Sequence, residues 1–465
     1  MSDFPVPELA ERARRCAGRL RDAERVLHVS HIDADGLTSG AVGTRALERA
    51  GVEVETAFEK QLDAGAIEEI AASGYETVLF TDFGSGQLNH IVEHEFTPVI
   101  ADHHQPADVE AEFHLNPLLE GVDGGSELSG AGATYLLARA LLGEDACDLA
   151  ALAVVGAVGD RQQRDGELVG ANAEIVREGV EAGVLDTAPD LTLYGAQTRP
   201  LPRLLTFADD VHIRGVTGSQ RGAMDFLEGL DADLTTENGW KRWVDLEESD
   251  RRTVASALLK RALASGVSAD EAESLIGTTY TLAAEKPGTE LRDASEFSTL
   301  LNATARYERA DVGLAVCLGD REGAFDAARE LLAEHRRNLS EGIEWVEREG
   351  TRKEEHLQWF DAGDEIRETI VGIVAGMAMG ADGIDRNTPI VAFADADEGE
   401  VKVSARGTNR LVRRGLDLSE AMGEAARAVG GDGGGHTVAA GATIPEGEEE
   451  AFIEHADRIL GEQLG

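Results

Sequence analysis

Three short apolar segments near the N-terminus each end in a polar loop, and this repetition constrains the fold more than any other feature of the sequence. The segments are Val26–Ser30, Thr77–Phe80 and Pro98–Ala101. Helical patterns such as Thr38–Ala50 separate them. Short apolar runs that alternate with helices indicate β-α-β units. We therefore predict an α/β domain with a doubly wound, mainly parallel sheet, which binds its ligand at the carboxyl ends of the strands.

The ends of these segments carry carboxylates and imidazoles, the groups that bind hard divalent cations. They are His31, Asp33 and Asp35 after the first segment, Asp82 after the second, Asp102, His103 and His104 after the third, and Asp160 after an apolar helix, Leu149–Val158. Mixed oxygen and nitrogen ligation suits Mn²⁺ or Mg²⁺, whereas zinc favours more Cys or His. One such cluster alone is more simply interpreted as a turn or a helix cap. Four clusters at consecutive element ends of one sheet predict a two-metal site for phosphoryl displacement.

A second group of candidate residues lies near the C-terminus. Ser404 and Arg406 end a predicted strand, and Gly434, Gly435 and His436 lie in a glycine-rich stretch. Glycine-rich turns before helices expose N–H groups to phosphates, and an arginine can bind phosphate through two parallel hydrogen bonds. A flexible loop is the simpler interpretation of glycine richness alone. We expect this stretch to lead into a helix and to bind phosphate.

The chain is long enough for three domains. We predict one domain over residues 1–205, a helical insert or connecting region over 206–360, and a smaller α/β domain over 361–465, with the active site in the cleft between the lobes. The central region contains Trp240 and Trp243. Packing on the core of that region is the simpler interpretation of these tryptophans, and an exposed anchor for a partner is the alternative.

The net charge is −45, from 88 acidic and 43 basic residues. A protein that repels nucleic acid is one interpretation, and a protein adapted to multimolar salt is the other. The acidic residues are spread over the whole chain, which favours the halophilic interpretation. At 1 M salt the Debye length is about 3 Å, so the global charge indicates habitat and not substrate.

Cysteine spacing and hydropathy indicate a cytoplasmic protein without a membrane segment. Cys16, Cys147 and Cys317 offer neither a disulfide framework nor a zinc spacing, which suits a reducing compartment. No apolar run reaches the length of a membrane-spanning helix, and the first residues lack the pattern of a signal peptide.

The motifs together resemble a known family. In order they are HxDADG from His31, TDxG around Asp82, DHH from Asp102, GD at Asp160, SxR from Ser404 and GGGHxxAAG up to Gly441. This set resembles the DHH phosphoesterases with a DHH-associated C-terminal domain, and within them the RecJ group in its short archaeal-type form. The match covers about residues 25–165 and 360–445, and we recognise no motif in the central stretch.

The resemblance implies a role for each candidate residue. It assigns His31 and Asp33 to one Mn²⁺, Asp35, His103 and Asp160 to a second, and Asp82 to a bridge between them, with Mg²⁺ as the alternative metal. It implies that His104 contacts the scissile phosphate and that Asp102 orients a neighbouring histidine. Ser404, Arg406 and His436 are expected to hold the nucleic-acid backbone or its terminal phosphate, which Gly434 and Gly435 allow to approach. Because no metal-binding position is substituted, an inactive scaffold is not expected.

The leading hypothesis is therefore an exonuclease acting on single-stranded DNA or RNA in repair or replication. An oligoribonuclease or a cyclic-dinucleotide phosphodiesterase shares every motif and stays open. A replisome subunit with accessory nuclease activity, docked on helicase-associated proteins, also stays open. Inorganic pyrophosphatase is disfavoured because its C-terminal lobe is lysine-rich around its Ser-Arg motif, whereas this sequence has Ala and Gly in that region.

Two departures from the family pattern bear on the substrate. Bacterial RecJ carries a further OB-type domain that helps to bind single strands, and this sequence ends at Gly465, so we do not expect a strict preference for single-stranded DNA. The motif at Asp160 continues as Arg-Gln-Gln and not with apolar residues and proline. We expect this change to alter the wall of the pocket beside Asp160.

Overall fold

The computed structural model describes residues 4–465, apart from 209–210, 382 and 397–398. The chain forms two compact units, residues 1–329 and residues 330–465. Each unit has its own sheet and its own core.

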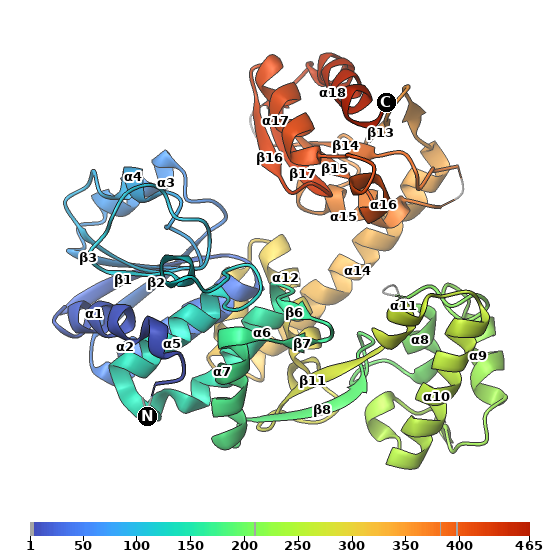
Figure 1. The fold of residues 1–465 in the computed structure, drawn as a ribbon, viewed down its shortest axis with the longest axis horizontal. Helices are drawn as coiled ribbons and strands as arrows, with labels where there is room; N and C mark the ends of the chain where they lie inside the picture. Colours follow the sequence, from blue (N-terminus) through green and yellow to red (C-terminus); the bar gives the residue numbers. More distant parts are fainter. Residues whose placement is uncertain (1–3, 209–210, 382, 397–398) are drawn as a thin grey trace. The chain divides into compact units, whose positions relative to one another are not determined.

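The first unit is built on a five-stranded parallel sheet with the order β2-β1-β3-β4-β5. Its strands are β1 (Arg25–His31), β2 (Glu53–Glu59), β3 (Thr77–Thr81), β4 (Thr97–Ala101) and β5 (His114–Leu115). One face carries α3 (Ala64–Ala72) and α4 (Leu88–Ile91), and the other carries α1 (Ala10–Arg21), α2 (Ala34–Ala50) and α5 (Gly130–Leu142) (Figure 1). The prediction of a doubly wound, mainly parallel α/β domain is confirmed.

Helix α2 begins at Ala34, four residues before the predicted start at Thr38. The Asp33 carboxylate accepts a hydrogen bond from the Gly36 N–H at 3.0 Å and so caps the helix. The first motif therefore lies partly on a helix, and this fixes the direction of Asp35.

The central part of the first unit contains a separate helical subdomain. Strand β8 (Leu185–Leu191) pairs antiparallel with β11 (Ile276–Leu282), and both connections to the subdomain pass through this ribbon. The subdomain helices are α8 (Leu201–Thr206), α9 (Gln220–Glu228), α10 (Glu248–Ala264) and α11 (Ala269–Glu273). They enclose a core of their own.

Both tryptophans belong to that core. Trp243 is 3% exposed and donates a hydrogen bond from Nε1 to the Asp190 carboxylate at 3.1 Å, and Trp240 packs against the same cluster. The exposed-anchor alternative is therefore wrong for Trp243, and the simpler interpretation is confirmed.

After the ribbon, the chain returns to the first domain. Helix α12 (Ala294–Arg306) packs against α6 (Ala150–Gly159) and α2, and α13 (Ala310–Cys317) packs against α2. Helix α14 (Gly323–Glu349) then leads into the second unit. No helix in the described ranges has the length and apolar character needed to cross a membrane.

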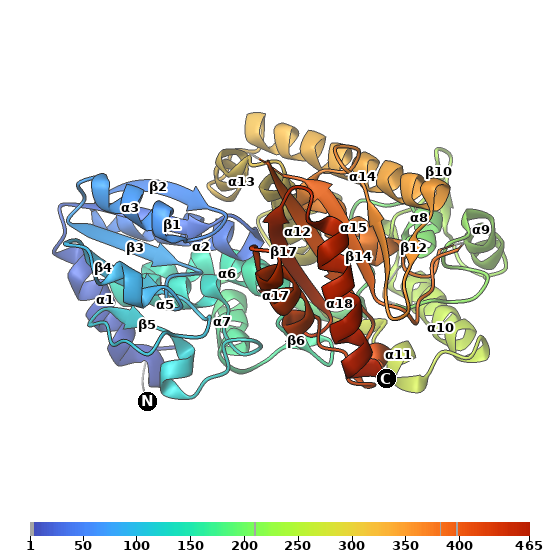
Figure 2. The ribbon, with the colours of Figure 1, turned by 90° about the horizontal axis from the view of Figure 1, so that it is seen from above.

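The second unit is a six-stranded mixed sheet between helices, with the order β12-β13-β14-β15-β17-β16 (Figure 2). Its strands are β12 (Arg352–Lys353), β13 (Gln358–Asp361), β14 (Ile390–Asp395), β15 (Glu400–Arg406), β16 (Asp432–Gly435) and β17 (Ala439–Pro445). Helix α15 (Glu368–Ala378) packs with one cluster of core residues, and α17 (Leu418–Ala428) and α18 (Glu449–Leu464) pack with another.

The expectation that the glycine-rich stretch leads into a helix is wrong. Residues 432–435 form β16, which turns at His436 and pairs antiparallel with β17. The two strands lie so close that a Cβ on Gly433 would stand 2.9 Å from the Gly441 carbonyl oxygen and 2.8 Å from the Ala442 Cβ. The glycines therefore serve close strand pairing.

Two helix-interior glycines differ in the space around them and give a matched stability test. A Cβ on Gly43 of α2 would lie 2.4 Å from Cε1 of the buried His28 ring, whereas a Cβ on Gly18 of α1 would meet no atom within 4 Å. We expect Gly43→Ala to lower the free energy of unfolding by about 1–3 kcal/mol through overpacking. We expect Gly18→Ala to raise it by about 1 kcal/mol through helix propensity. Denaturant unfolding checks both values, and equal effects of the two changes would contradict the packing of α2 on β1.

A buried carboxyl group makes stability depend on pH. Glu296 of α12 is 1% exposed and accepts hydrogen bonds from the Gln197 N–H at 2.7 Å and from the Thr198 hydroxyl. Burial raises its pKa to about 7, against the hydrogen bonds from Thr198 and Gln197, which lower it. The folded state then keeps a proton that the unfolded state loses, so stability falls as pH rises between the unfolded and folded pKa values. We expect a loss of about 3 kcal/mol from pH 4.5 to 7, removed in Glu296→Gln, as measured by denaturant unfolding across that range.

Candidate metal centre

All six predicted metal ligands lie together at the carboxyl edge of the parallel sheet. His31 ends β1, Asp82 directly follows β3, and Asp102 directly follows β4. Among these six residues, two groups have ligand atoms within 4.8 Å of one another, namely His31, Asp33 and Asp82, and Asp35, His103 and Asp160. Parallel pairing brings these strand ends to one edge, as the sequence predicted.

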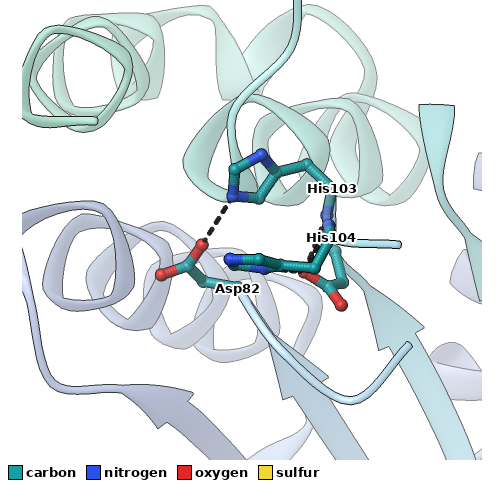
Figure 3. A group of neighbouring side chains, drawn as sticks. Asp82, His103 and His104 are labelled. Atoms are coloured by element: carbon teal, nitrogen blue, oxygen red, sulfur yellow. Dashed lines mark hydrogen bonds and ion pairs between the residues drawn. The ribbon is translucent and has the colours of Figure 1, made fainter. Parts of the chain in front are cut away.

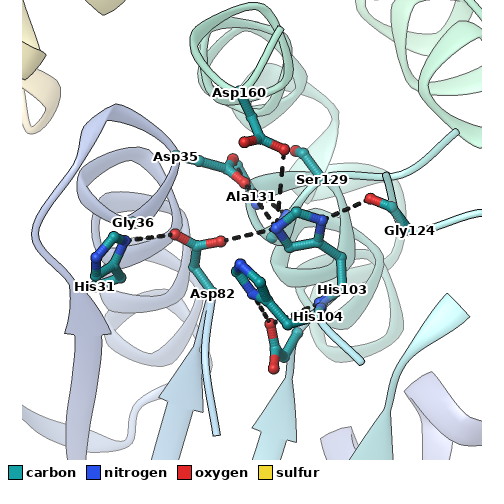
Figure 4. Close-up of polar contacts among 12 residues, drawn as sticks. His31, Asp35, Gly36, Asp82, His103, His104, Gly124, Ser129, Ala131 and Asp160 are labelled. Atoms are coloured by element: carbon teal, nitrogen blue, oxygen red, sulfur yellow. Dashed lines mark hydrogen bonds and ion pairs between the residues drawn. The ribbon is translucent and has the colours of Figure 1, made fainter. Parts of the chain in front are cut away.

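The Asp82 carboxylate lies between His31 of the first group and His103 of the second (Figure 4). Its Oδ2 is 3.4 Å from Nδ1 of His31, and its Oδ1 is 3.3 Å from Nε2 of His103. The side chain is 2% exposed. One buried carboxylate therefore presents one oxygen to each group.

Asp82 holds this position through an unusual backbone. Its φ is +62°, a left-handed conformation that a residue other than glycine rarely adopts, and its N–H donates to the Ala101 carbonyl at 3.1 Å. Strain of this kind persists where the surroundings fix it, and it is common at functional sites. Gly130, at the start of α5, allows the approach, because a Cβ there would lie 2.3 Å from Asp82 Oδ1.

The first group is partly open to solvent. His31 Nδ1 is 3.2 Å from Asp33 Oδ2, and the two side chains are 28% and 45% exposed. Burial lowers the pKa of His31, but its hydrogen bonds to Asp33 and Asp82 outweigh this and raise the pKa to about 11. The carboxylates thus favour a positive charge at this position.

The second group is buried and acidic. Asp35 is 2% exposed and accepts hydrogen bonds from the Gly130 and Ala131 N–H groups at 2.7 and 3.0 Å. These donors belong to the first turn of α5, where the helix dipole also favours a negative charge. Burial and the charges of Asp82 and Asp160 nevertheless raise the pKa of Asp35 well above its ordinary value. The protein supplies too little positive charge for this group of carboxylates.

His103 shows how a cation would complete the group. Its Nδ1 lies 2.6 Å from the Gly124 carbonyl oxygen, which can only accept, so Nδ1 carries the hydrogen and Nε2 presents a lone pair. That Nε2 and Asp82 Oδ1 are buried and have no hydrogen-bond partner within the part of the chain that the structure describes. Two acceptor atoms 3.3 Å apart need a proton or a metal ion between them. Burial lowers the pKa of His103, and its contact with Asp82 reverses this and raises the pKa well above the ordinary value. The donor set fits a divalent metal ion.

His104 lies beside this cluster (Figure 3), where it pairs with Asp102. Asp102 is fully buried, and its Oδ1 accepts from Nδ1 of His104 at 2.9 Å and from the N–H of His103 at 2.7 Å. Burial raises the pKa of Asp102, but the hydrogen bond from His104 outweighs it, and the pKa falls to about 2. The His104 side chain is 56% exposed, and its Nε2 is left to bind a ligand. The histidine that Asp102 orients is therefore His104.

The sequence did not identify two further positioning residues. Gln162 is 1% exposed and donates from Nε2 to Asp160 Oδ2 at 2.8 Å and to the Gly124 carbonyl at 2.9 Å, and Asn172 donates to its Oε1 at 2.7 Å. The departure from the family pattern after Asp160 was the available signal. Asn302 of α12 accepts from the Ala34 N–H at 3.1 Å, and a contact so distant in sequence leaves no local pattern.

The predicted substrate-binding residues all belong to the second unit. Ser404 on β15 lies opposite Gly441 on β17, which lies opposite Gly434 on β16, so the predicted motifs stand in register on three neighbouring strands. His436 forms the turn of the hairpin. Helix α15 passes close above, since a Cβ on Gly372 would lie 2.9 Å from Ser404 Oγ and 2.5 Å from Arg406 Nη2.

Family comparisons identify domains along most of the chain. The DHH family N-terminal domain matches residues 25–157, the DHH-CID domain matches residues 193–276, and the DHHA1 domain matches residues 357–462. The central stretch, in which we recognised no motif, therefore contains a family domain, and this domain coincides with the helical subdomain.

Two relatives are similar in sequence. The chain is 29% identical over 445 residues to an uncharacterized protein of Methanocaldococcus jannaschii, which covers 94% of this chain and 93% of the relative. It is 28% identical over 171 residues to the single-stranded-DNA-specific exonuclease RecJ of Bacillus subtilis, which covers 34% of this chain and 22% of that protein.

Solved structures share the fold over almost the whole chain. RecJ from Thermus thermophilus in complex with Mn²⁺ has a TM-score of 0.61 at 18% identity, covering 99% of this chain and 56% of that one. CDC45 from Entamoeba histolytica has a TM-score of 0.65 at 10% identity, covering 96% of this chain and 97% of that one. The chain thus combines DHH, DHH-CID and DHHA1 domains and has the architecture of a RecJ-like member of the DHH superfamily.

Proposed function

We propose that this protein is a RecJ-like, metal-dependent exonuclease that hydrolyses phosphodiester bonds of single-stranded DNA or RNA. The observation that carries the proposal is the buried Asp82 carboxylate, whose two oxygens face two separate groups of metal-binding side chains. The likeness to RecJ proteins supports the same activity.

The donor set indicates which residues would hold the metal ions. His31 and Asp33 would bind one ion, Asp35, His103 and Asp160 would bind a second, and Asp82 would bridge both. When bound, two such ions supply an activated water and stabilise the attacking and leaving oxygens. Mn²⁺ is the proposed metal and Mg²⁺ the alternative, because the ligands are mostly carboxylates and the Thermus thermophilus RecJ has been solved with each ion.

The remaining candidate residues would act on the substrate directly. His104 donates from Nδ1 to Asp102, so the buried carboxylate stabilises the protonated imidazole and leaves Nε2–H for a phosphate oxygen. The hydrogen bond to Asp102 raises the pKa of His104, against burial, which lowers it. The pair with Asp102 therefore favours the protonated form of His104, which can donate a hydrogen bond to a scissile phosphate.

In the second unit, Ser404, Arg406 and His436 would hold the nucleic-acid backbone or its terminal phosphate. Gly434 and Gly435 lie in the strand that would face it, and a Cβ on Gly434 would meet no atom within 4 Å. Hydroxyl, guanidinium and imidazole groups are all suited to phosphate oxygens. These roles are part of the proposal.

A replisome subunit with accessory nuclease activity is the second candidate. The fold similarity to CDC45 of Entamoeba histolytica over almost all of both chains favours it. Both candidates are consistent with a role in DNA replication or repair. Both are also consistent with the cytoplasm of a halophilic organism and with helicase-associated proteins as partners.

Changing Asp82 tests the proposed centre. We expect Asp82→Asn to lower the rate of nucleotide release in Mn²⁺ by about 10³-fold or more, because one of its oxygens no longer serves as a charged ligand. The control is Asp22→Asn, which removes an exposed carboxylate at the end of α1 and should leave the rate unchanged. End-labelled DNA and RNA single strands of both polarities at high salt give the readout, and a 2–5-mer beside a 40-mer separates an exonuclease from an oligoribonuclease. Near-normal activity of Asp82→Asn would exclude the proposed centre.

Gln162 is expected to act through Asp160 and His103. Gln162→Leu removes the amide that donates to Asp160 Oδ2 and to the Gly124 carbonyl, which itself holds His103. We expect Mn²⁺ affinity to fall by about 10–100-fold, as for other residues that orient metal ligands, with cooperative unfolding retained. Calorimetric Mn²⁺ titration measures the change, with the exposed Gln220→Leu as a control. Two ions bound with wild-type affinity would show that Gln162 only fills space.

A further inference from the structure

The second unit carries a basic segment that the proposed site does not use. Between Val401 and Leu416 the sequence has no acidic residue, although 88 of the 465 residues of the chain are acidic. The same stretch contains five basic residues, which are Lys402, Arg406, Arg410, Arg413 and Arg414. We call Arg410, Arg413 and Arg414 the arginine segment.

The arginine segment is held in place by apolar anchors. Helix α16 (Asn409–Val412) is capped by Thr408, and Leu411 and Leu416 are 1% and 2% exposed in the core that α17 and α18 also line. Arg410, Arg413 and Arg414 are exposed. The segment is therefore fixed to the sheet through its leucines and turns its arginines to solvent.

Several exposed arginines elsewhere in this chain have acidic partners close by. Arg252 pairs with Glu248 at 2.5 Å, Arg177 with Glu174 and Glu181 at 2.9 Å, and Arg458 with Glu462 at 2.7 Å. Within the described ranges, Arg410, Arg413 and Arg414 form no ion pair and no side-chain hydrogen bond. In so acidic a protein, three neighbouring arginines without partners leave a local positive charge for a ligand to neutralise.

The segment is continuous with the predicted substrate-binding residues. It lies shortly after Arg406, the last residue of β15, and the chain on either side of it is hydrogen-bonded to the turn after His436. The Gly407 N–H donates to the Val438 carbonyl at 2.9 Å, and the Leu418 N–H donates to the Thr437 carbonyl at 3.0 Å. Both α16 and the turn between β16 and β17 belong to the second unit (Figure 1).

We propose that Arg410, Arg413 and Arg414 bind backbone phosphates of a polynucleotide, beyond the terminal nucleotide that the Ser404, Arg406 and His436 group would hold. Planar guanidinium groups bind phosphate oxygens through paired hydrogen bonds and carry no base specificity. The inference rests on the proposed function, which places the terminal nucleotide at the Ser404, Arg406 and His436 group and so sets where the rest of the strand continues. It names a polynucleotide as the substrate class. A dinucleotide has few backbone phosphates beyond its terminal one, so it would make few contacts with the segment.

The test is binding of a labelled single-stranded 30-mer and of a dinucleotide in the presence of a chelator, so that no turnover occurs. The triple variant Arg410→Gln, Arg413→Gln and Arg414→Gln is compared with Arg221→Gln, Arg252→Gln and Arg348→Gln, which removes the same charge from exposed arginines that have acidic partners. Anisotropy over a series of salt concentrations gives the affinity and its salt slope, and thermal unfolding checks folding.

We expect the arginine-segment variant to bind the 30-mer at least about tenfold more weakly and to lose about 2 from the slope of log affinity against log salt, since each contact with a single strand contributes about 0.7. The loss for the dinucleotide should be much smaller, and the control should match the wild type. Equal 30-mer affinity in both variants would overturn the proposal. Unchanged 30-mer binding together with self-association that the substitutions abolish would overturn it in favour of an acidic protein partner. These readouts need no turnover, so they are independent of whether the chain hydrolyses DNA or RNA.

Discussion

The mutual repulsion of buried carboxylates around Asp82 is the constraint on which the rest of the centre depends. Asp35 and Asp82 are each 2% exposed, and Asp160 Oδ2 lies 3.9 Å from the same Nε2 of His103 that Asp82 faces. Burying one unpaired charge costs several kcal/mol, and burying several of the same sign costs more unless a cation compensates them. The raised pKa values of Asp35, His31 and His103 express the same shortage of positive charge.

The surrounding fold can be understood as the means of holding these carboxylates close together. Glycines remove side chains where the carboxylates would otherwise clash. A Cβ on Gly130 would lie 2.3 Å from Asp82, and a Cβ on Gly156 of α6 would lie 2.3 Å from Asp35. The first turn of α5 gives two N–H donors to Asp35, and Gln162 gives one to Asp160. These N–H donors are uncharged, so they orient the carboxylates without cancelling their negative charge.

The sequence predicted the features that arise from local patterns. Apolar runs ending in polar residues predicted the parallel sheet, and the meeting of strand ends at one edge predicted the cluster around Asp82.

Two local structures were predicted incorrectly, because one residue type serves two purposes. Asp33 is both a candidate ligand and the cap that starts α2. Glycine marks both phosphate-binding turns and close strand pairs, and in β16 it serves the pairing. Asn302 was not identified, because its contact with the Ala34 N–H joins residues far apart in the sequence. Gln162 was marked only by the departure from the family pattern after Asp160, and its hydrogen bond to Asp160 is seen only in the fold.

The large negative charge is compatible with the proposed nucleic-acid substrate, because salt limits the distance over which the charges repel. At multimolar salt, repulsion between the acidic surface and a phosphate backbone is screened within about 3 Å, which leaves direct contacts as the main electrostatic contribution. Under those conditions the local arrangement of charge matters and the total does not. An acid-free stretch with exposed arginines beside the His436 turn places positive charge where guanidinium groups can form paired hydrogen bonds to phosphate at contact distance. At such salt concentrations a strongly acidic protein can keep its surface charge and still bind a polyanion through a few clustered basic residues.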